Sequence, residues 1–394
     1  MRAPVAVRVP FCGLPCAPLF VQPGTDPLLV EGGCAVARAA AARRTDPGGP
    51  RVDGRPATIA SAIDRAVAIL GGARRPHVGG LAWSTVETAR RAARLARRLG
   101  GSIDIEGSER LRGEIEAIGQ SGLVGATFGA VRDRADVVLL WRVGGLADHP
   151  DLLPASIALD GTPRARRMIA SASAGVPAST GADLEALATL RATVAGATGA
   201  KTSPFAEAAA ALLEARFAAI LWSAESARGA GGAAIVTALG RLVRDLEARG
   251  RRAVGRSLGM PGDVAGAMSA LQSETGLPRA VRFASAGGAA APDPFDGVPP
   301  AERGGAILLV GPRQACAGGR APAIVVGPDL PDGSPEPDVF IPTALPGLSG
   351  RGTWLRADGV AAPVRGPIPA TAPFEEQILA QLAERLPAHA AEPA

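Results

Sequence analysis

Residues 135–141 read Ala-Asp-Val-Val-Leu-Leu-Trp, and this stretch decides the fold class. Its apolar residues follow one another without alternation, and charged residues and glycines stand on either side of the run. Strands that are buried on both faces have this composition, which is typical of parallel sheets covered by helices. We therefore expect a central strand of a parallel sheet at residues 135–141.

Helical and strand patterns alternate on both sides of this stretch. Further apolar runs predict strands at residues 217–222, 306–310 and 323–326. Helical periodicity predicts helices at 59–70, at 84–99 with Ser84 as N-cap and Glu87 completing a capping box, and at 231–249. Alternation of the two kinds of element indicates an α/β fold with open, mostly parallel sheets.

Composition narrows the class of protein. The chain has 394 residues, 47% hydrophobic and 20% charged, which is enough for two or three domains with their own cores. Its net charge of +5 comes from arginines scattered over the whole length, whereas nucleic-acid-binding proteins concentrate basic residues and interleave aromatic ones. No apolar run approaches the roughly 20 residues of a membrane span. We expect a cytoplasmic protein that binds neither nucleic acid nor membranes.

Five arginines gather on the helix expected at 84–99, and they allow two interpretations. They are Arg90, Arg91, Arg94, Arg97 and Arg98. An anionic partner is one interpretation. A solvated helix face that docks onto a neighbouring subunit is the other, and we favour it.

Three of the four cysteines form a pattern near the N-terminus. The spacing of Cys12, Cys16 and Cys34 resembles the iron–sulfur site of molybdopterin-type oxidoreductases, which is Cys-x2-Cys-x3-Cys with a distant fourth Cys. Val9 occupies the first of these positions, so a [4Fe–4S] cluster would have only three protein ligands. We favour the interpretation that the three are small buried residues, ahead of a zinc site completed by a distant ligand.

Three later segments carry a resemblance to a family. They are 128–141 with His149-Pro150 after it, then 263–267 followed by 273–278 and 281–283, and finally 338–344 with 352–353 and 357–360. In this order they resemble segments of the B subunit of formylmethanofuran dehydrogenase, within the molybdopterin oxidoreductase superfamily. The matches span most of the chain.

The resemblance raises the question of a metal ligand. In the family a Cys or selenocysteine followed by His binds tungsten or molybdenum shortly before the strand at 135–141. Residues 103–113 contain neither type, and between Cys34 and His149 the one residue of either type is His77. Ser108 or Glu109 would replace a soft thiolate poorly. We therefore expect no catalytic residue, no metal and no cofactor in this chain.

Other residues of chemical interest have simpler interpretations. We expect Cys316 to be a buried apolar residue and His389 to belong to the tail. Gly229, Gly231 and Gly232 open a helix after a strand and could receive an anion, but we favour inherited loop geometry.

The resemblance also implies an architecture. It implies molybdopterin-oxidoreductase-like domains of the formate dehydrogenase type, without the C-terminal β-barrel domain. Residues 1–51 would form a vestigial iron–sulfur-type segment, 52–135 and 215–300 a discontinuous α/β domain, 136–214 an inserted α/β domain, and 301–394 a segment packing back on the core.

A chain of this family without its metal ligands resembles the B subunit of the formyltransferase/hydrolase complex of methylotrophs. That complex moves a formyl group from formyl-tetrahydromethanopterin to methylofuran and hydrolyses it to formate during formaldehyde oxidation. The expected role is non-catalytic, holding the A, C and D subunits of a hetero-oligomer. One alternative is the B subunit of a tungsten- or molybdenum-dependent formylmethanofuran dehydrogenase with an active redox site. Another is a binding module for an anionic molecule, such as a polyglutamate tail, in the former pterin cleft.

Overall fold

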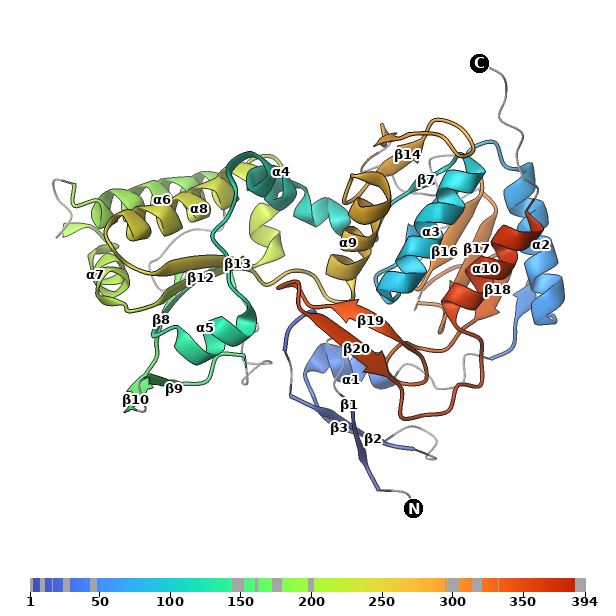
Figure 1. The fold of residues 1–394 in the computed structure, drawn as a ribbon, viewed down its shortest axis with the longest axis horizontal. Coiled ribbons are helices and arrows are strands. Elements are labelled where there is room, and N and C mark those ends of the chain that lie inside the picture. The colour runs from blue at the N-terminus through green and yellow to red at the C-terminus, as the bar shows by residue number, and fades with distance from the viewer. Residues whose placement is uncertain are drawn as a thin grey trace. The chain divides into compact units, whose positions relative to one another are not determined.

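Two compact units make up the chain in the computed structural model (Figure 1). Unit 1 contains Met1–Ser108 and Met260–Ala394, and unit 2 contains Glu109–Gly259. The structure describes residues 3–7, 11–15, 17–23, 29–42, 48–143, 152–159, 162–171, 179–197, 202–294, 296, 305–313, 321–331 and 333–386. Within this part of the chain, no helix is both long and apolar enough to cross a membrane.

The main sheet of unit 1 is mixed, with a parallel centre. Its order is β15-β14-β7-β6-β16-β17-β18-β4-β5, and neighbours from β7 to β18 are parallel while both ends are antiparallel. The strands are β4 (Arg51–Val52), β5 (Arg55–Pro56), β6 (His77–Gly80), β7 (Ser102–Ile103), β14 (Val281–Phe283), β15 (Ala290–Pro292), β16 (Ile307–Val310), β17 (Ala323–Gly327) and β18 (Val339–Pro342).

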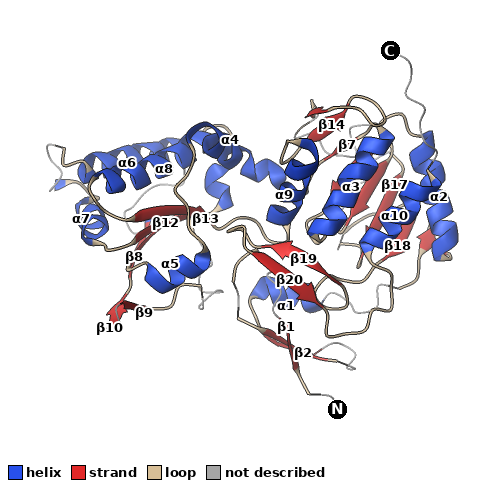
Figure 2. Cartoon of the chain, in the orientation of Figure 1, coloured by secondary structure: helices blue, strands red, loops and turns tan. Residues whose placement is uncertain are grey.

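Helices and two small sheets complete unit 1 (Figure 2). The helices are α1 (Ala35–Ala42), α2 (Ile59–Gly72), α3 (Val86–Leu99), α9 (Val264–Thr275) and α10 (Glu375–Arg385). The small antiparallel sheets are β1 (Val5–Val7), β2 (Leu19–Gln22) and β3 (Leu29–Gly32), and the hairpin of β19 (Arg351–Leu355) and β20 (Ala361–Arg365).

The start of α3 differs from the expected one by a residue. Thr85, not Ser84, is the N-cap, and its hydroxyl accepts a hydrogen bond from the Thr88 N–H. The Glu87 carboxylate accepts the N–H of Thr353 in β19 at 3.0 Å. Glu87 therefore joins the helix to the hairpin, which local sequence could not reveal.

Unit 2 has an all-parallel four-stranded sheet among its described residues. The order is β11-β8-β12-β13, with β8 (Val137–Trp141), β11 (Arg167–Ala170), β12 (Ala218–Trp222) and β13 (Ala253–Ser257). Around it lie α4 (Arg112–Ser121), α5 (Phe128–Arg134), α6 (Thr180–Val194), α7 (Ala206–Glu214), α8 (Gly232–Ala248), the 3-10 helix η5 (Ala224–Ala227), and the hairpin of β9 (Ser156–Leu159) and β10 (Thr162–Ala165).

Both faces of this sheet are covered, as the run at 135–141 predicts. Alternate residues of β8 pack on opposite sides: Leu139 faces the α6, α7 and α8 layer, and Leu140 faces α5. All five residues of β8 are buried. The expected central strand, the other three strands, the three helices and the α/β class are confirmed.

The domain limits expected from the sequence need correction. They divide the chain at 135 and 215, but β8 and β12 are neighbouring parallel strands in register from Val137 with Ala218 to Trp141 with Trp222. Because backbone hydrogen bonds and a continuous core join them, residues 136–214 are not a separate domain. The chain leaves unit 1 after Ser108 and re-enters it at Met260.

Candidate functional site

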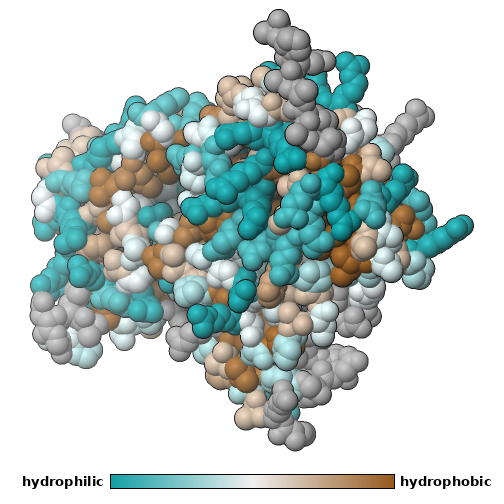
Figure 3. All heavy atoms as spheres, turned by 45° about the vertical axis from the view of Figure 1, so that its right-hand side comes forward, coloured by the Kyte–Doolittle hydropathy of each residue, from teal (hydrophilic) through white to brown (hydrophobic). Residues whose placement is uncertain are grey.

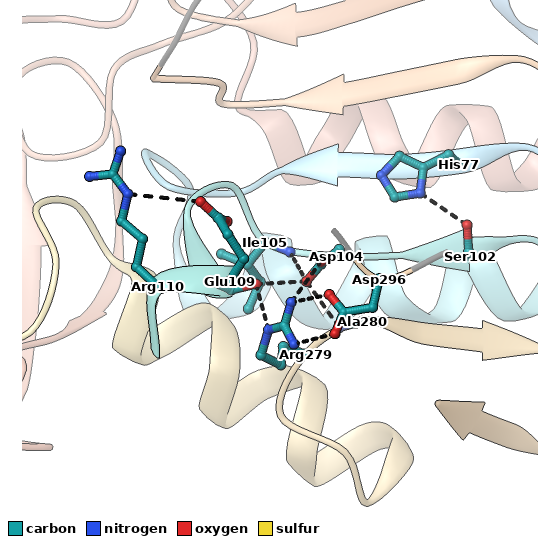
Figure 4. Close-up of polar contacts among 10 residues, drawn as sticks. His77, Ser102, Asp104, Ile105, Glu109, Arg110, Arg279, Ala280 and Asp296 are labelled. Carbon is teal, nitrogen blue, oxygen red and sulfur yellow. Dashed lines mark hydrogen bonds and ion pairs between the residues drawn. The ribbon is translucent and has the colours of Figure 1, made fainter. Parts of the chain in front are cut away.

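The loop after β7 is where the resemblance puts the metal ligand, and here it ends in a polar cluster (Figure 4). Asp104 follows β7 directly, and one carboxylate oxygen accepts three hydrogen bonds. The donors are the N–H of Ile105 at 2.8 Å, the hydroxyl of Ser108 at 2.8 Å and the N–H of Ala280 at 2.9 Å. This carboxylate closes the loop on itself and ties it to the entry of β14.

Arg279 comes from the segment before β14 and completes the cluster. Its guanidinium donates to both oxygens of Asp296, one at 2.7 Å, and through Nε to the Ser108 hydroxyl at 3.0 Å. It also lies 3.6 Å from the second oxygen of Asp104. We call Asp104, Ser108, Arg279 and Asp296 the Arg279 cluster.

Burial makes the charges of the Arg279 cluster interdependent. The Arg279 side chain is 8% exposed and Ser108 is fully buried. Burial raises the pKa of Asp104 above its usual value. The Arg279 charge and the hydrogen bonds to the carboxylate act in the opposite direction but do not cancel the effect of burial. A buried ion pair of this kind is expensive to break, because the partner left behind remains charged and out of water.

The Arg279 cluster does not suit a tungsten or molybdenum centre. Such centres take soft thiolate ligands. Within the Arg279 cluster, the side chain closest in size to a cysteine is that of Ser108, which offers a hydroxyl instead. That hydroxyl donates to Asp104 and accepts from Arg279, so it is already committed to the protein. Among the described residues, no group of three or more His, Cys, Asp or Glu side chains is placed to hold a metal ion.

The neighbouring part of the sheet edge is closed by the chain itself. Strand order reverses between β6 and β16, and open α/β sheets bind ligands beyond the carboxyl ends of strands at such a point. Here the N–H of Leu81 donates to Val310 O at 2.5 Å, and the N–H of Trp83 donates to Gly311 O at 3.0 Å. Backbone hydrogen bonds therefore join the two loops where a ligand would enter between them.

Aromatic side chains cover the same edge. Trp83 lies in the loop after β6, and its ring centroid is 5.5 Å from that of Phe11 and 6.0 Å from that of Trp354. Phe11 and Trp354 meet edge to face at 5.3 Å. Phe11 belongs to the N-terminal segment and Trp354 to β19, so segments far apart in sequence meet over this edge.

Three carboxyl groups lie close to the start of α3. Asp263 is the N-cap of α9 and accepts the N–H groups of Gly266 and of Leu355, the latter at 2.7 Å. Burial raises its pKa well above the usual range, against these two hydrogen bonds. Burial also acts to raise the pKa of Glu87, but hydrogen bonds, chiefly from Thr353, outweigh it and leave that pKa lowered.

Glu375 is the third of these carboxyl groups and begins α10. It is 3% exposed, and burial raises its pKa to about 8, against the neighbouring hydroxyls of Ser84 and Thr88. Gly311 leaves room for it, since a Cβ there would lie 2.7 Å from a Glu375 carboxylate oxygen. The carboxyl group therefore fills space at the end of β16.

Two of the three cysteines of the N-terminal pattern are in the described part of the chain. Both are buried, and neither forms a disulfide. The Cys12 thiol donates to Leu14 O at 3.7 Å, and the Cys34 sulfur accepts the N–H of Ala37 at the start of α1. Val9, Cys16, Cys316, His149 and His389 lie outside the described residues. The cluster interpretation of this pattern is therefore not tested.

Two other sequence candidates have structural roles. His77 is the first residue of β6 and is 2% exposed, and its Nδ1 lies 3.0 Å from the Ser102 hydroxyl. Gly231 has a φ of 92° as N-cap of α8, and a Cβ there would lie 2.6 Å from Thr180. A Cβ on Gly232 would lie 2.0 Å from Ala227 O, so close packing requires glycine at both positions.

Comparison with solved structures finds this fold elsewhere. One match is a chain of the formyltransferase/hydrolase complex (FhcABCD) from Methylorubrum extorquens, solved by X-ray crystallography in complex with methylofuran. The TM-score is 0.70 at 24% identity, over 86% of this chain and 98% of that one. This chain and that one share a fold.

A second match is acetylene hydratase from Pelobacter acetylenicus, with a TM-score of 0.62 at 12% identity, over 97% of this chain and 69% of that one. No protein-family model and no curated protein matches the sequence. The comparisons therefore establish the fold alone.

Sequence reasoning missed the Arg279 cluster. Residues 103–113 contain Asp104 and Ser108, but Arg279 and Asp296 are more than 150 residues further along the chain. No periodicity or spacing links them to Asp104. Asp104 is one of several charged residues between 104 and 116, and none of them indicates a partner near residues 279 or 296.

Proposed function

We propose that this chain is the non-catalytic, structural B subunit of a complex that transfers and hydrolyses formyl groups. The proposed reaction of the whole complex is transfer from formyl-tetrahydromethanopterin to methylofuran and release of formate. The chain would hold the A, C and D subunits together as a folded block, with catalysis carried out by the A and D subunits.

The Arg279 cluster is the observation that carries this proposal. It lies in the segment to which the resemblance assigns the metal ligand of the redox enzymes, and its hydroxyl, carboxylates and guanidinium are satisfied by one another. The fold shared with a chain of a formyltransferase/hydrolase complex supports the choice of complex. The loops joined across β6 and β16 favour a structural role over the binding module, since within unit 1 they occupy the usual ligand position.

Anaerobic purification of the tagged chain from its own host tests the proposal. The chain should bring down three further subunits, and the complex should hydrolyse formyl-tetrahydromethanopterin in the presence of methylofuran. Iron, molybdenum and tungsten should be substoichiometric with respect to this chain. One molybdenum or tungsten per chain, with formylmethanofuran oxidation, would establish the dehydrogenase alternative instead.

A triple variant of Cys12, Cys16 and Cys34 to Ser separates a structural from a catalytic role. The complex should assemble and retain nearly full turnover, because none of the three thiols acts on a substrate. Deletion of the chain should abolish turnover by dismantling the complex. Normal assembly of the triple variant with loss of activity would overturn the proposal.

A further inference from the structure

Four arginines of α3 line one groove of unit 1. The groove lies between α3, α10 and the loop at 286–287, and its volume is about 530 Å³. Arg91, Arg94, Arg97 and Arg98 form its basic lining, and Leu95, Leu379, Ala380 and Ala383 form its apolar part. No acidic side chain lines the groove within the described part of the chain.

Two of the four arginines have structural partners. Arg97 donates to Glu274 O at 2.6 Å, and its guanidinium lies 5.3 Å from the centre of the Phe283 ring. Arg98 donates to Leu386 O at 2.6 Å. Both contacts lie at the C-terminal ends of helices, where cations are stabilised, so these two side chains are explained by the fold of unit 1.

The other two arginines are exposed. Arg94 donates two hydrogen bonds to the Glu274 carboxylate in α9, at 2.8 and 3.2 Å, but 67% of its side chain stays exposed. Arg91 is exposed and has no ion pair with any residue that the structure describes. The fold therefore gives no reason for the charge of Arg91 at this groove, and it leaves most of Arg94 open to a further partner. Figure 3 shows that hydrophilic side chains form broad bands over this side of the molecule, with apolar patches between them.

The spacing of the lining residues fits a helix. Arg91, Arg94, Leu95 and Arg98 stand at i, i+3, i+4 and i+7, the stripe along which one helix packs on another. On the opposite wall, Ala380 and Ala383 of α10 are small, so a backbone can approach closely. A helix with carboxylates at the same spacing would pair with Arg91 and Arg94 and cover the apolar lining.

We infer that this groove docks an acidic helical segment of a partner protein. The inference rests on the proposed function only in that the partner would be another member of the complex. Its chemistry follows from the groove. A nucleic acid would neutralise the arginines but leave the apolar lining uncovered, and for this reason it is an outcome of the test rather than the inference.

Binding of a synthetic peptide to the purified full chain tests the inference. The probe is a fluorescein-labelled helix of about 16 residues, roughly 24 Å long, with Glu at one-turn spacing and Ala and Leu between. Fluorescence anisotropy should show saturable binding. A peptide that differs only by a proline in place of a central Ala, a single-stranded DNA and vesicles of anionic lipid should each bind at least ten-fold more weakly.

Matched variants locate the site. Arg91→Glu should weaken binding of the peptide about ten-fold, whereas Arg90→Glu, with the same charge change on an exposed neighbour outside the groove, should change it less than two-fold. Ala383→Trp, which fills the groove without changing charge, should also weaken binding. Circular dichroism of each variant, matching that of the parent chain, shows that the fold is kept. Equal effects of Arg90→Glu and Arg91→Glu, or equal binding of DNA, would overturn the inference.

The same variants in the host keep this inference apart from the proposed function. If the parent chain brings down the complex and Arg91→Glu lowers the yield of one partner at raised ionic strength, both stand. Equal recovery of the complex with Arg90→Glu and with Arg91→Glu would refute docking at the groove and leave the proposed function intact. Failure of the parent chain to bring down any partner would refute the proposed function, while the peptide still tests the groove.

Discussion

Arg279 brings a charge into the interior of unit 1 and meets it with two carboxylates and a hydroxyl. The contacts are geometrically specific, since the guanidinium fork matches both oxygens of Asp296 and its Nε reaches Ser108. Such a network holds the 104–108 loop in one conformation. The network stabilises the fold because removal of one member leaves a buried charge without its partner.

Replacing Arg279 by Leu should lower the free energy of unfolding by about 3 kcal/mol. This is the lower end for a broken buried pair, because Asp296 keeps part of its surface in water. Denaturant unfolding measures the change. Arg385→Leu is the control, since its pair with Asp64 is exposed and should contribute at most about 1 kcal/mol. Equal losses in the two variants would contradict a buried network.

Glu375 should make stability depend on pH. Its pKa is raised to about 8 in the folded chain, so its stabilising contribution is fully present below the unfolded pKa and is lost as the pH rises through 8. Glu375→Gln should remove this dependence, at most about 1.4 kcal/mol per pH unit.

Thermal unfolding of parent and variant between pH 5 and 9 measures the difference. The melting temperature of Glu375→Gln should rise relative to that of the parent as the pH rises. Glu376→Gln, which changes the neighbouring and more exposed carboxylate, is the control and should show a much smaller gain. Parallel curves for Glu375→Gln and the parent would show that the carboxyl group is not buried as described.

Single side chains also join elements of unit 1 that the sequence keeps apart. Asp263 caps α9 and holds Leu355 of β19, and Glu87 in α3 holds Thr353 of the same strand. The hairpin of β19 and β20 is thus anchored to two helices by carboxyl groups. Its ordering depends on those anchors more than on its own two strands, because an isolated hairpin is marginally stable.

Asp263→Ala should loosen α9 and the hairpin together, at a cost of about 2 kcal/mol for a lost cap and a lost buried acceptor. Hydrogen–deuterium exchange should speed up at the amides of Gly266 and Leu355. Asp263→Asn keeps the acceptor oxygen and carries no charge, so it should be at least as stable as the parent. Faster exchange at only one of the two amides would mean that Asp263 does not couple them.

At the scale of the whole molecule, unit 2 is one continuous stretch inserted into unit 1. Its sheet and both of its cores are built from residues 109–259 alone. A stretch with its own core and a complete sheet meets the usual conditions for independent folding.

A fragment of residues 109–259 should therefore fold cooperatively by itself. A fragment of residues 136–214, the domain expected from the sequence, should not, because it contains β8 but lacks β12 and β13. Dispersion of amide signals in NMR spectra and a single unfolding transition measure the outcome. A folded 136–214 fragment, or a disordered 109–259 fragment, would favour the limits at 135 and 215 instead.

The sequence by itself determined the class of fold and the nature of its strands. The run at 135–141 has no alternation because β8 is covered on both faces, so the local residue types indicate its burial. Helix periods located α2, α3 and α8 for the same reason. The absence of Cys and His from residues 103–113 was also readable, since it requires no knowledge of contacts.

Only the tertiary structure decided where the chain crosses between units and what occupies the sheet edge of unit 1. Strand pairing is a contact between distant residues, so nothing in residues 136–214 shows that β8 lies beside β12. Likewise Asp104 and Arg279 meet because β7 and β14 are neighbours, and isolated charged residues look alike in a sequence whether they are solvated or paired. Contacts between distant residues create these sites. Patterns in the sequence reflect only the contacts between residues close together in the chain.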